Sequence, residues 1–227
     1  DPSATVTVPA GTVVKSHAGS LTVRGSLVAE GTLSDPVVFT STLDDSIGGD
    51  TTGDGTGSAP TAGDWQGINV SVGGAVRLAR VRMAYAASGV VGSGEVRVVD
   101  SEFRDLTDTG VQVPRTDDAY NGYASSGEVV ITGSSFVRMA HGVALSQIHL
   151  PVVTGNTFTA VGTVGVNLCT PWSTTDRCSV VKSAALQVSG DLDLDQLSGN
   201  QGSGNGAQAM VVNGHIVADG GWPSGGL

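Results

Sequence analysis

The sequence predicts an all-β chain wound into a parallel β-helix, because one short pattern returns at a nearly constant spacing. A large apolar residue is followed six or seven positions later by Gly-Val, and this occurs four times. The four occurrences are Met83 with Gly89 and Val90, Phe103 with Gly110 and Val111, Phe136 with Gly142 and Val143, and Phe158 with Gly165 and Val166. The apolar residues are 20, 33 and 22 positions apart (83 to 103, 103 to 136, 136 to 158). A period near 22 that carries insertions is typical of a solenoid.

Two further observations favour strands over helices. The segments 129–132 and 152–154 are rich in β-branched residues and are bounded by Gly, Asn and Ser, as strands often are. No segment of useful length shows the 3.6-residue period of an amphipathic helix. Strands that recur once per coil run in the same direction, so the sheets are expected to be parallel. With coils of about 22 residues, roughly ten coils would use the whole chain.

The elements can be taken in chain order. Residues 5–41 hold four expected stretches of strand, separated by glycines suited to corners, at 6–8, 11–15, 20–29 and 36–41. Residues 44–64 contain five aspartates and almost no apolar residue, so they are expected to project from the core as an acidic loop. Trp65 then returns the chain to the core, and the four rungs follow. The last expected strands lie at 185–188, 192–194 and 209–217.

Two insertions interrupt the rungs, at 114–127 and 169–178. Each follows Gly-Val, one further residue and an apolar residue, so both are expected to leave the same corner of the coil. Parallel strands are spaced about 4.8 Å apart, which would place the loops roughly 10 Å apart. They would then line a groove suited to a sugar chain, unless their aromatic side chains merely fold over the column. The predicted groove residues are Arg115, Asp117, Asp118, Tyr120, Tyr123, Trp172, Asp176 and Arg177.

The composition argues against several classes of partner. The 21 acidic and 11 basic residues give a formal net charge of −10, which disfavours nucleic acid and anionic membranes and is compatible with divalent cations. No stretch of 18 apolar residues is present, so membrane insertion is not expected. Glycine is abundant, at 34 residues, while aromatic residues make up only 4%. This balance suits a narrow column filled by Val, Leu and Ile with tight corners.

The ends of the sequence suggest a larger protein. The chain opens close to a strand and without a signal peptide, whereas a complete solenoid needs polar caps over its column. Residues 1–227 are therefore expected to be a single β-helix domain from a longer tandem-repeat protein. Residues 218–227 are expected to be a linker to the next module, and neighbouring modules of the same chain are expected partners.

The two cysteines, Cys169 and Cys178, lie nine residues apart across a segment that contains proline. An isolated pair that flanks such an excursion favours a disulfide closing a loop, with two free thiols as the alternative. A structural zinc site is not expected, because the chain has no third or fourth cysteine to complete it.

The acidic loop is the strongest candidate site. In residues 50–55, oxygen-bearing side chains alternate ahead of a glycine, as in short loops that wrap oxygens around Ca²⁺. The loop is not an EF-hand, because the twelfth residue counted from Asp50 is Thr61 rather than glutamate. Carboxylates so close together repel one another unless a cation neutralises them. The predicted calcium ligands are Asp44, Asp45, Asp50, Asp54 and Asp64, and a solvated loop without metal is the alternative.

A group of short segments carries a resemblance to a known family. These segments are 11–15, 20–23, 25–27, 36–41, 44–45, 48–51, 53–55, 63–68 and 202–206. Together they resemble the right-handed parallel β-helix repeats of large secreted bacterial surface proteins, which are often adhesin-like. In those proteins the unit occurs in tandem, and a Gly-Trp-Pro stretch like 221–223 leads into the next copy. The resemblance implies a right-handed helix, an extracellular or cell-surface location and a modular setting, and it implies no known reaction.

The expected function is that of a non-catalytic extracellular module, ordered by Ca²⁺, that acts as a stiff spacer or a scaffold for adhesion to polysaccharide or cell-surface glycans. The alternative is a carbohydrate-active enzyme of the polysaccharide lyase or glycoside hydrolase type, or a glycan-binding module, that uses loops 114–127 and 169–178. Adjacent acids such as Asp117 and Asp118 point to opposite faces of a strand and make no catalytic pair. The histidines show no spacing typical of a metal site or a nucleophile, so each is expected at a turn or on the surface, at positions 17, 141, 149 and 215. No catalytic residue is predicted.

Overall fold

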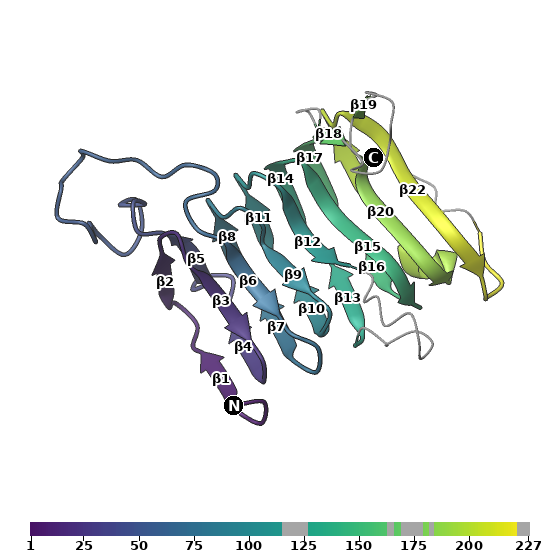
Figure 1. The fold of residues 1–227 in the computed structure, drawn as a ribbon, viewed down its shortest axis with the longest axis horizontal. Coiled ribbons are helices and arrows are strands. Elements are labelled where there is room, and N and C mark those ends of the chain that lie inside the picture. The colour runs from purple at the N-terminus through teal and green to yellow at the C-terminus, as the bar shows by residue number, and fades with distance from the viewer. Residues whose placement is uncertain (115–126, 163–165, 169–178, 182–183, 222–227) are drawn as a thin grey trace, which may run out of the picture.

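The computed structural model is a column of stacked coils, with the first coil at one end and the last at the other (Figure 1). The structure describes residues 1–114, 127–162, 166–168, 179–181 and 184–221. Three sheets run along the column, and within each of them neighbouring strands are parallel. The predicted all-β parallel β-helix is thereby confirmed.

Each of the first six coils contributes one strand to each sheet, in the order sheet A, sheet B, sheet C, and the last coil contributes strands to sheets B and C. Sheet A contains β1 (Thr5–Val8), β4 (Ser26–Glu30), β7 (Ala75–Ala79), β10 (Glu95–Val99), β13 (Val129–Thr132) and β16 (Val152–Thr154). Sheet B contains β2 (Val13–Ser16), β5 (Val37–Ser41), β8 (Val81–Ala84), β11 (Glu102–Arg104), β14 (Ser135–Met139), β17 (Thr157–Val161) and β21 (Gln201–Ser203). Sheet C contains β3 (Ser20–Val23), β6 (Gly67–Val70), β9 (Val90–Gly92), β12 (Thr109–Val113), β15 (His141–His149), β20 (Ala184–Leu192) and β22 (Ala207–Ile216).

Sheets B and C each have seven strands, so the described chain makes seven coils rather than about ten. The expected number was too high because three excursions, 42–66, 114–128 and 162–183, use residues without adding a coil. Within the last of these, β18 (Val166–Leu168) pairs in antiparallel fashion with β19 (Ser179–Val181). A 3₁₀ turn, η1 (Leu194–Leu197), packs beside β16 where a seventh strand of sheet A would lie.

The apolar residues of the predicted rung pattern are confirmed in register over all three intervals. Met83 pairs with Phe103, Phe103 with Phe136, and Phe136 with Phe158. The three phenylalanine rings stack inside the column, with centroids 5.3 and 5.2 Å apart. The glycine of each rung makes room for the ring of the next coil: a methyl group built on Gly142 would overlap Phe158. The Phe and Gly of the sequence pattern therefore recur together because each ring packs against the glycine of the preceding coil.

A second ladder is polar and lies inside the corner between sheets A and B. Each of its side chains accepts a hydrogen bond from the backbone N–H of the same position in the preceding coil. Ser101 Oγ accepts from Val81 N at 3.1 Å, and Ser134 Oγ accepts from Ser101 N at 3.1 Å. Asn156 Oδ1 then accepts from Ser134 N at 2.9 Å, and Asn200 Oδ1 from Asn156 N at 3.1 Å. This polar ladder satisfies backbone donors that the corner would otherwise leave buried without partners.

From the third to the sixth coil, each of two corners contains one residue in the left-handed conformation. At the corner between sheets B and C the φ angles are 60°, 55°, 56° and 53°, at Tyr85, Asp105, Arg138 and Ala160. At the corner between sheets A and B the left-handed residues are Arg80, Asp100, Gly133, Gly155 and Gly199. Such angles cost a non-glycine residue about 1–2 kcal/mol, which the surrounding stack must offset.

Two predicted features of the C-terminal third are wrong. The residues after Phe158 do not form the next rung, because Val143 pairs with Leu186 rather than with Val166. The expected strand at 192–194 stops at Leu192, since Asp193 accepts a hydrogen bond from Asp195 N and caps η1. Among the described residues, no helix is long and apolar enough to cross a bilayer.

Candidate functional site

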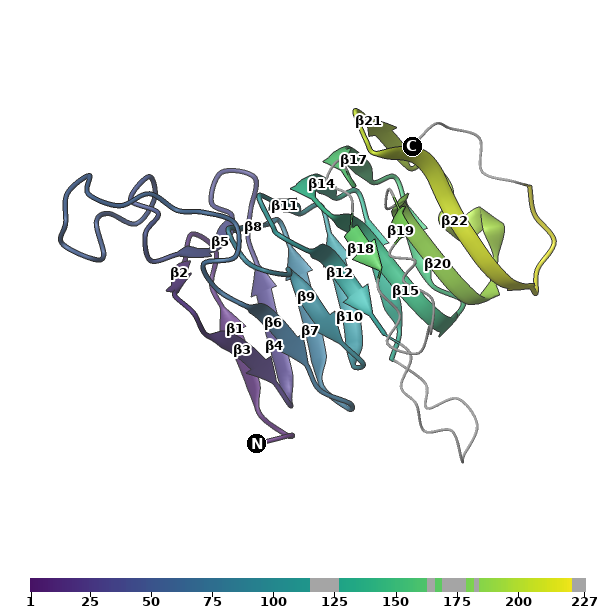
Figure 2. The same cartoon turned by 45° about the horizontal axis from the view of Figure 1, so that its top comes forward.

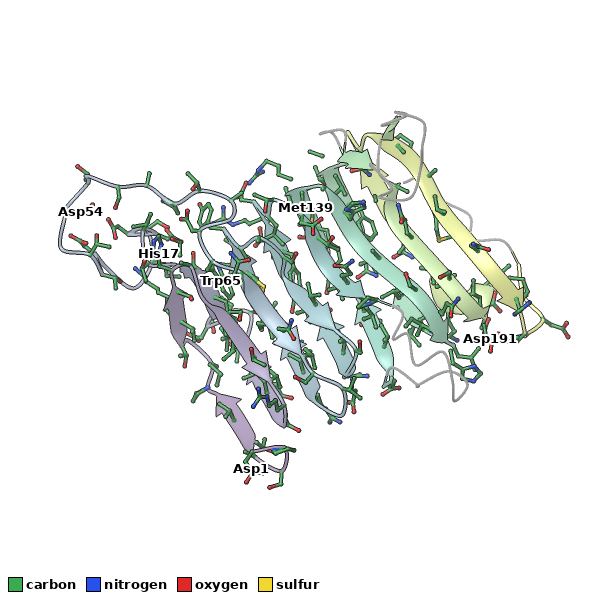
Figure 3. The ribbon with its side chains drawn as sticks, in the orientation of Figure 1. Asp1, His17, Asp54, Trp65, Met139 and Asp191 are labelled. Carbon is green, nitrogen blue, oxygen red and sulfur yellow. The ribbon has the colours of Figure 1, made fainter. Side chains whose placement is uncertain are left out.

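The predicted acidic loop is the longest described excursion from the column. It joins β5 to β6 and projects beyond the first coils (Figures 1 and 2). Asp54 lies on its far part, while Trp65 at its end is buried in the core, with its Nε1–H donating to Ala84 O at 2.9 Å (Figure 3). The predicted projection of the loop and the return of Trp65 to the core are both confirmed.

Two of the predicted ligands hold the base of the loop. Asp44 is 3% exposed, and its Oδ2 accepts a hydrogen bond from Thr40 Oγ1 at 2.7 Å. Asp64 Oδ2 accepts from Ser41 Oγ at 2.7 Å and from Thr61 N at 3.0 Å. Their carboxylates therefore tie both ends of the loop to the end of β5.

The pKa of Asp64 is set by opposing effects. Burial raises it, but the hydrogen bonds donated by Ser41 and Thr61, together with the nearby charge of His17, hold it below the ordinary value. Asp64 is therefore a carboxylate in the folded protein at neutral pH. Its backbone oxygen also accepts from Ala18 N at 2.6 Å, which links the loop to the first coil.

A lysine of the first coil donates hydrogen bonds to the base of the loop. Lys15 Nζ, on β2, donates to the backbone oxygens of Asp44 at 2.8 Å and Gly49 at 2.6 Å. Both carbonyl oxygens therefore bind a positive charge that the first coil supplies. The sequence signal for this contact was weak, because 29 residues separate Lys15 from Asp44.

The remaining three predicted ligands come together. One carboxylate oxygen from each of Asp45, Asp50 and Asp54 lies within 4.8 Å of the others. Asp45 is half-buried, and its Oδ1 is shielded from solvent without a hydrogen-bond partner. A buried carboxylate oxygen without a partner is costly, and a cation would provide one. The predicted set of five is thus divided into a cluster of three and two residues at the base.

Asp50 organises the turn within this cluster. Its Oδ2 accepts from Gly55 N at 2.8 Å and its Oδ1 from Gly53 N at 2.6 Å. These amides lower the pKa of the Asp50 carboxyl, so it stays ionised well into the acid range. Thr52 Oγ1 lies 2.8 Å from Asp54 Oδ1, which adds a hydroxyl oxygen beside the three carboxylates.

The predicted glycan groove and disulfide fall outside the described residues. This applies to Arg115, Asp117, Asp118, Tyr120, Tyr123, Trp172, Asp176, Arg177, Cys169 and Cys178. The structure does place the points at which the two insertions leave the column. Residues 114–128 follow β12 of sheet C, whereas 162–183 follow β17 of sheet B. The expected shared corner is therefore wrong, because the second excursion begins one strand earlier in its coil.

Three of the histidines lie near aspartates: His149 and His215 are exposed as predicted, whereas His141 lies on β15 with a side chain only 20% exposed, so the predicted turn or surface position is wrong for it. His141 Nδ1 is 3.6 Å from Asp108 Oδ1, and His149 and His215 both approach Asp191. The interaction with His141 lowers the pKa of Asp108 against the effect of its burial.

Comparisons with protein-family models, with curated proteins and with solved structures find no match for this chain. Its function is therefore argued from its own geometry.

Proposed function

We propose that this chain is a non-catalytic extracellular module, in which Ca²⁺ orders the loop between β5 and β6 and the β-helix acts as a stiff spacer or binding scaffold. The observation that carries the proposal is the convergence of Asp45, Asp50 and Asp54 within 4.8 Å. The secreted, modular setting rests on the resemblance of the repeats to those of bacterial surface proteins.

The donor set fits calcium better than a softer metal. Ca²⁺ takes six to eight oxygen ligands in a flexible arrangement, and carboxylates can bind it through one or both oxygens. Asp45, Asp50 and Asp54 supply up to six oxygens, and Thr52 and water would complete the shell. Imidazole and thiolate ligands, which transition metals prefer, are absent from the described cluster.

Calcium bound here would stabilise more than the loop. Lys15 and Ala18 in the first coil and Thr40 and Ser41 in the second are hydrogen-bonded to the loop base. Melting the first two coils must therefore disturb the loop. A ligand that binds only the folded loop shifts the unfolding equilibrium of these coils.

The test is thermal unfolding of EDTA-treated protein with and without 10 mM Ca²⁺. Extracellular calcium modules bind with a Kd of about 10⁻⁴–10⁻³ M, so linkage predicts about 1.4–2.7 kcal/mol of stabilisation. For a domain of this size that corresponds to a rise of roughly 3–10 °C in Tm. The Asp50→Asn/Asp54→Asn variant should not respond to Ca²⁺, whereas Asp219→Asn, which changes an exposed residue beyond the last strand, should respond like the parent.

Two results would contradict the proposal. One is a parent Tm that does not change with Ca²⁺. The other is an equal rise in the parent and in Asp50→Asn/Asp54→Asn, which would place the bound ion elsewhere.

A further inference from the structure

A row of three polar side chains crosses sheet C near the C-terminal end of the column. His149 on β15 is in register with Asp191 on β20, and Asp191 is in register with His215 on β22. All three side chains are accessible, with relative exposures of 73%, 44% and 83%. Figure 3 shows Asp191 at the far end of the molecule from Asp54, so this His-Asp-His row is separate from the acidic loop.

Both imidazoles already face the same carboxylate. His149 Nδ1 lies 3.2 Å from Asp191 Oδ2, and His215 Nδ1 lies 3.4 Å from Asp191 Oδ1. Two ligands on one tetrahedral Zn²⁺, each at about 2.0–2.1 Å from the metal, are separated by about 3.3 Å. Each nitrogen–oxygen separation in the row therefore matches that of two neighbouring zinc ligands. The two imidazoles approach different oxygens of Asp191, however, and the three residues do not bring one ligand atom each within 4.8 Å of the others, so the rings must turn toward each other to share an ion.

We propose that the His-Asp-His row is a binding site for Zn²⁺ or a similar first-row transition metal ion. Asp191 supplies the central carboxylate, and His149 and His215 supply one imidazole nitrogen each. Two imidazoles and one carboxylate suit zinc, copper or nickel, whereas Ca²⁺ and Mg²⁺ prefer sites made of oxygen alone. Water would take the fourth position on the metal.

The backbone holds the row in place while the imidazoles adjust. The strands are about 4.8 Å apart, so the two histidine backbones are about 9.6 Å apart, with Asp191 between them. Leu150 N donates to Asp191 O at 2.8 Å, and Val217 N donates to Leu192 O at 3.0 Å, which keeps all three strands paired beside the row. Because both rings are largely exposed, each can rotate toward a shared ion without repacking the core.

The protein offers a matched control for this site. His141 also pairs with an aspartate, Asp108, but no second histidine reaches that carboxylate among the described residues. A single His-Asp pair gives two ligands and a row of three gives three. Zinc affinity should therefore depend on His149 and His215 and not on His141.

The experiment is calorimetric titration of ZnCl₂ into the full chain at pH 7.5, where metal ions compete well with protons for imidazole. The parent should bind one Zn²⁺ at the row. Loss of an outer-shell partner already weakens metal sites about 10–100-fold, so His149→Ala, His215→Ala and Asp191→Asn should each weaken binding at least tenfold. His141→Ala, Asp50→Asn/Asp54→Asn and Cys169→Ser/Cys178→Ser should bind like the parent.

Circular dichroism of His149→Ala, Asp191→Asn and His215→Ala should match that of the parent, since these three side chains are accessible. The proposal is overturned if the parent takes up no Zn²⁺ at millimolar concentration, which would leave the row as hydrogen-bonded side chains only. It is equally overturned if His149→Ala and His215→Ala retain the affinity of the parent, or if the loss appears instead in His141→Ala or in the cysteine variant.

Discussion

Replacing Asn156 tests whether the polar ladder stabilises the column. The side chain is fully buried and serves both neighbouring coils. Its Oδ1 accepts from Ser134 N at 2.9 Å, while its Nδ2 donates to Ile131 O at 2.9 Å and to Asn200 Oδ1 at 3.0 Å. Asn156→Ala would leave the N–H of Ser134 without its partner and would remove one of the hydrogen bonds of the carbonyl of Ile131, which also lies in the ladder of sheet A. Asn200 Oδ1 would keep its bond from residue 156 N.

A buried group left without a partner costs about 1–3 kcal/mol and a lost hydrogen bond about 0.5–1.5 kcal/mol, so Asn156→Ala should lower the free energy of unfolding by about 2–4 kcal/mol. Asn156→Ser is the matched comparison, because coils four and five already carry serine at this position. Ser134 Oγ accepts from Ser101 N and donates to Thr132 O at 3.0 Å. A serine at 156 can accept from Ser134 N in the same way, so it should cost only about 1–3 kcal/mol.

The assay is urea unfolding of the parent and both variants, followed by circular dichroism and by tryptophan fluorescence. Coincidence of the two transitions establishes that a single free energy describes unfolding. The expected order of stability is parent, then Asn156→Ser, then Asn156→Ala. Equal losses in the two variants, or a loss below about 1 kcal/mol for alanine, would show that the ladder satisfies no backbone group that needs it.

Two other predictions follow from the packing and charges of the column. Gly142→Ala should lower the free energy of unfolding by about 1–3 kcal/mol, because the new methyl overlaps the Phe158 ring. In urea unfolding, the double variant Gly142→Ala/Phe158→Leu should lose less stability than the sum of the two single variants. Simple additivity of the two losses would refute the contact. The hydrogen bonds and charge of Arg138 hold the pKa of Asp105 below its ordinary value, so this pair stabilises the fold above about pH 4 and ceases to do so as pH falls through the lowered pKa. As the pH falls from about 5 to about 2, the free energy of unfolding should decrease less in Arg138→Gln than in the parent, whereas Arg97→Gln should behave like the parent.

The parallel β-helix could be predicted because its packing repeats. Phe136 and Gly142 recur at the coil period since each ring fills the space that the glycine of the preceding coil leaves. The excursions are harder to place because they interrupt the period. Gly165 and Val166 match the rung pattern in sequence, yet Val166 pairs with Val181 inside an excursion. A local pattern does not show whether the chain is still on the column.

The acidic loop was predicted as a unit, while its internal division was not. Alternating aspartates and glycines predict a calcium loop without specifying what each carboxylate contacts. Whether Asp44 binds a metal or the column depends on Thr40, whose hydroxyl reaches it at the end of β5. That contact depends on the angle at which the chain leaves the sheet, and no pattern within the loop encodes this angle.

The His-Asp-His row was not predicted from the sequence, because the bounds of the excursion 162–183 were not predicted correctly. His149 and Asp191 are 42 positions apart, and Asp191 and His215 are 24 apart (215 − 191), so the three look unrelated. The excursion 162–183 contains 22 residues, and removing it shortens the first interval to 20 (42 − 22). Both intervals then equal about one coil, and the three side chains fall at the same position of successive rungs. Scattered histidines in a solenoid are therefore best compared after the excursions have been removed, because the coil period alone decides which side chains become neighbours.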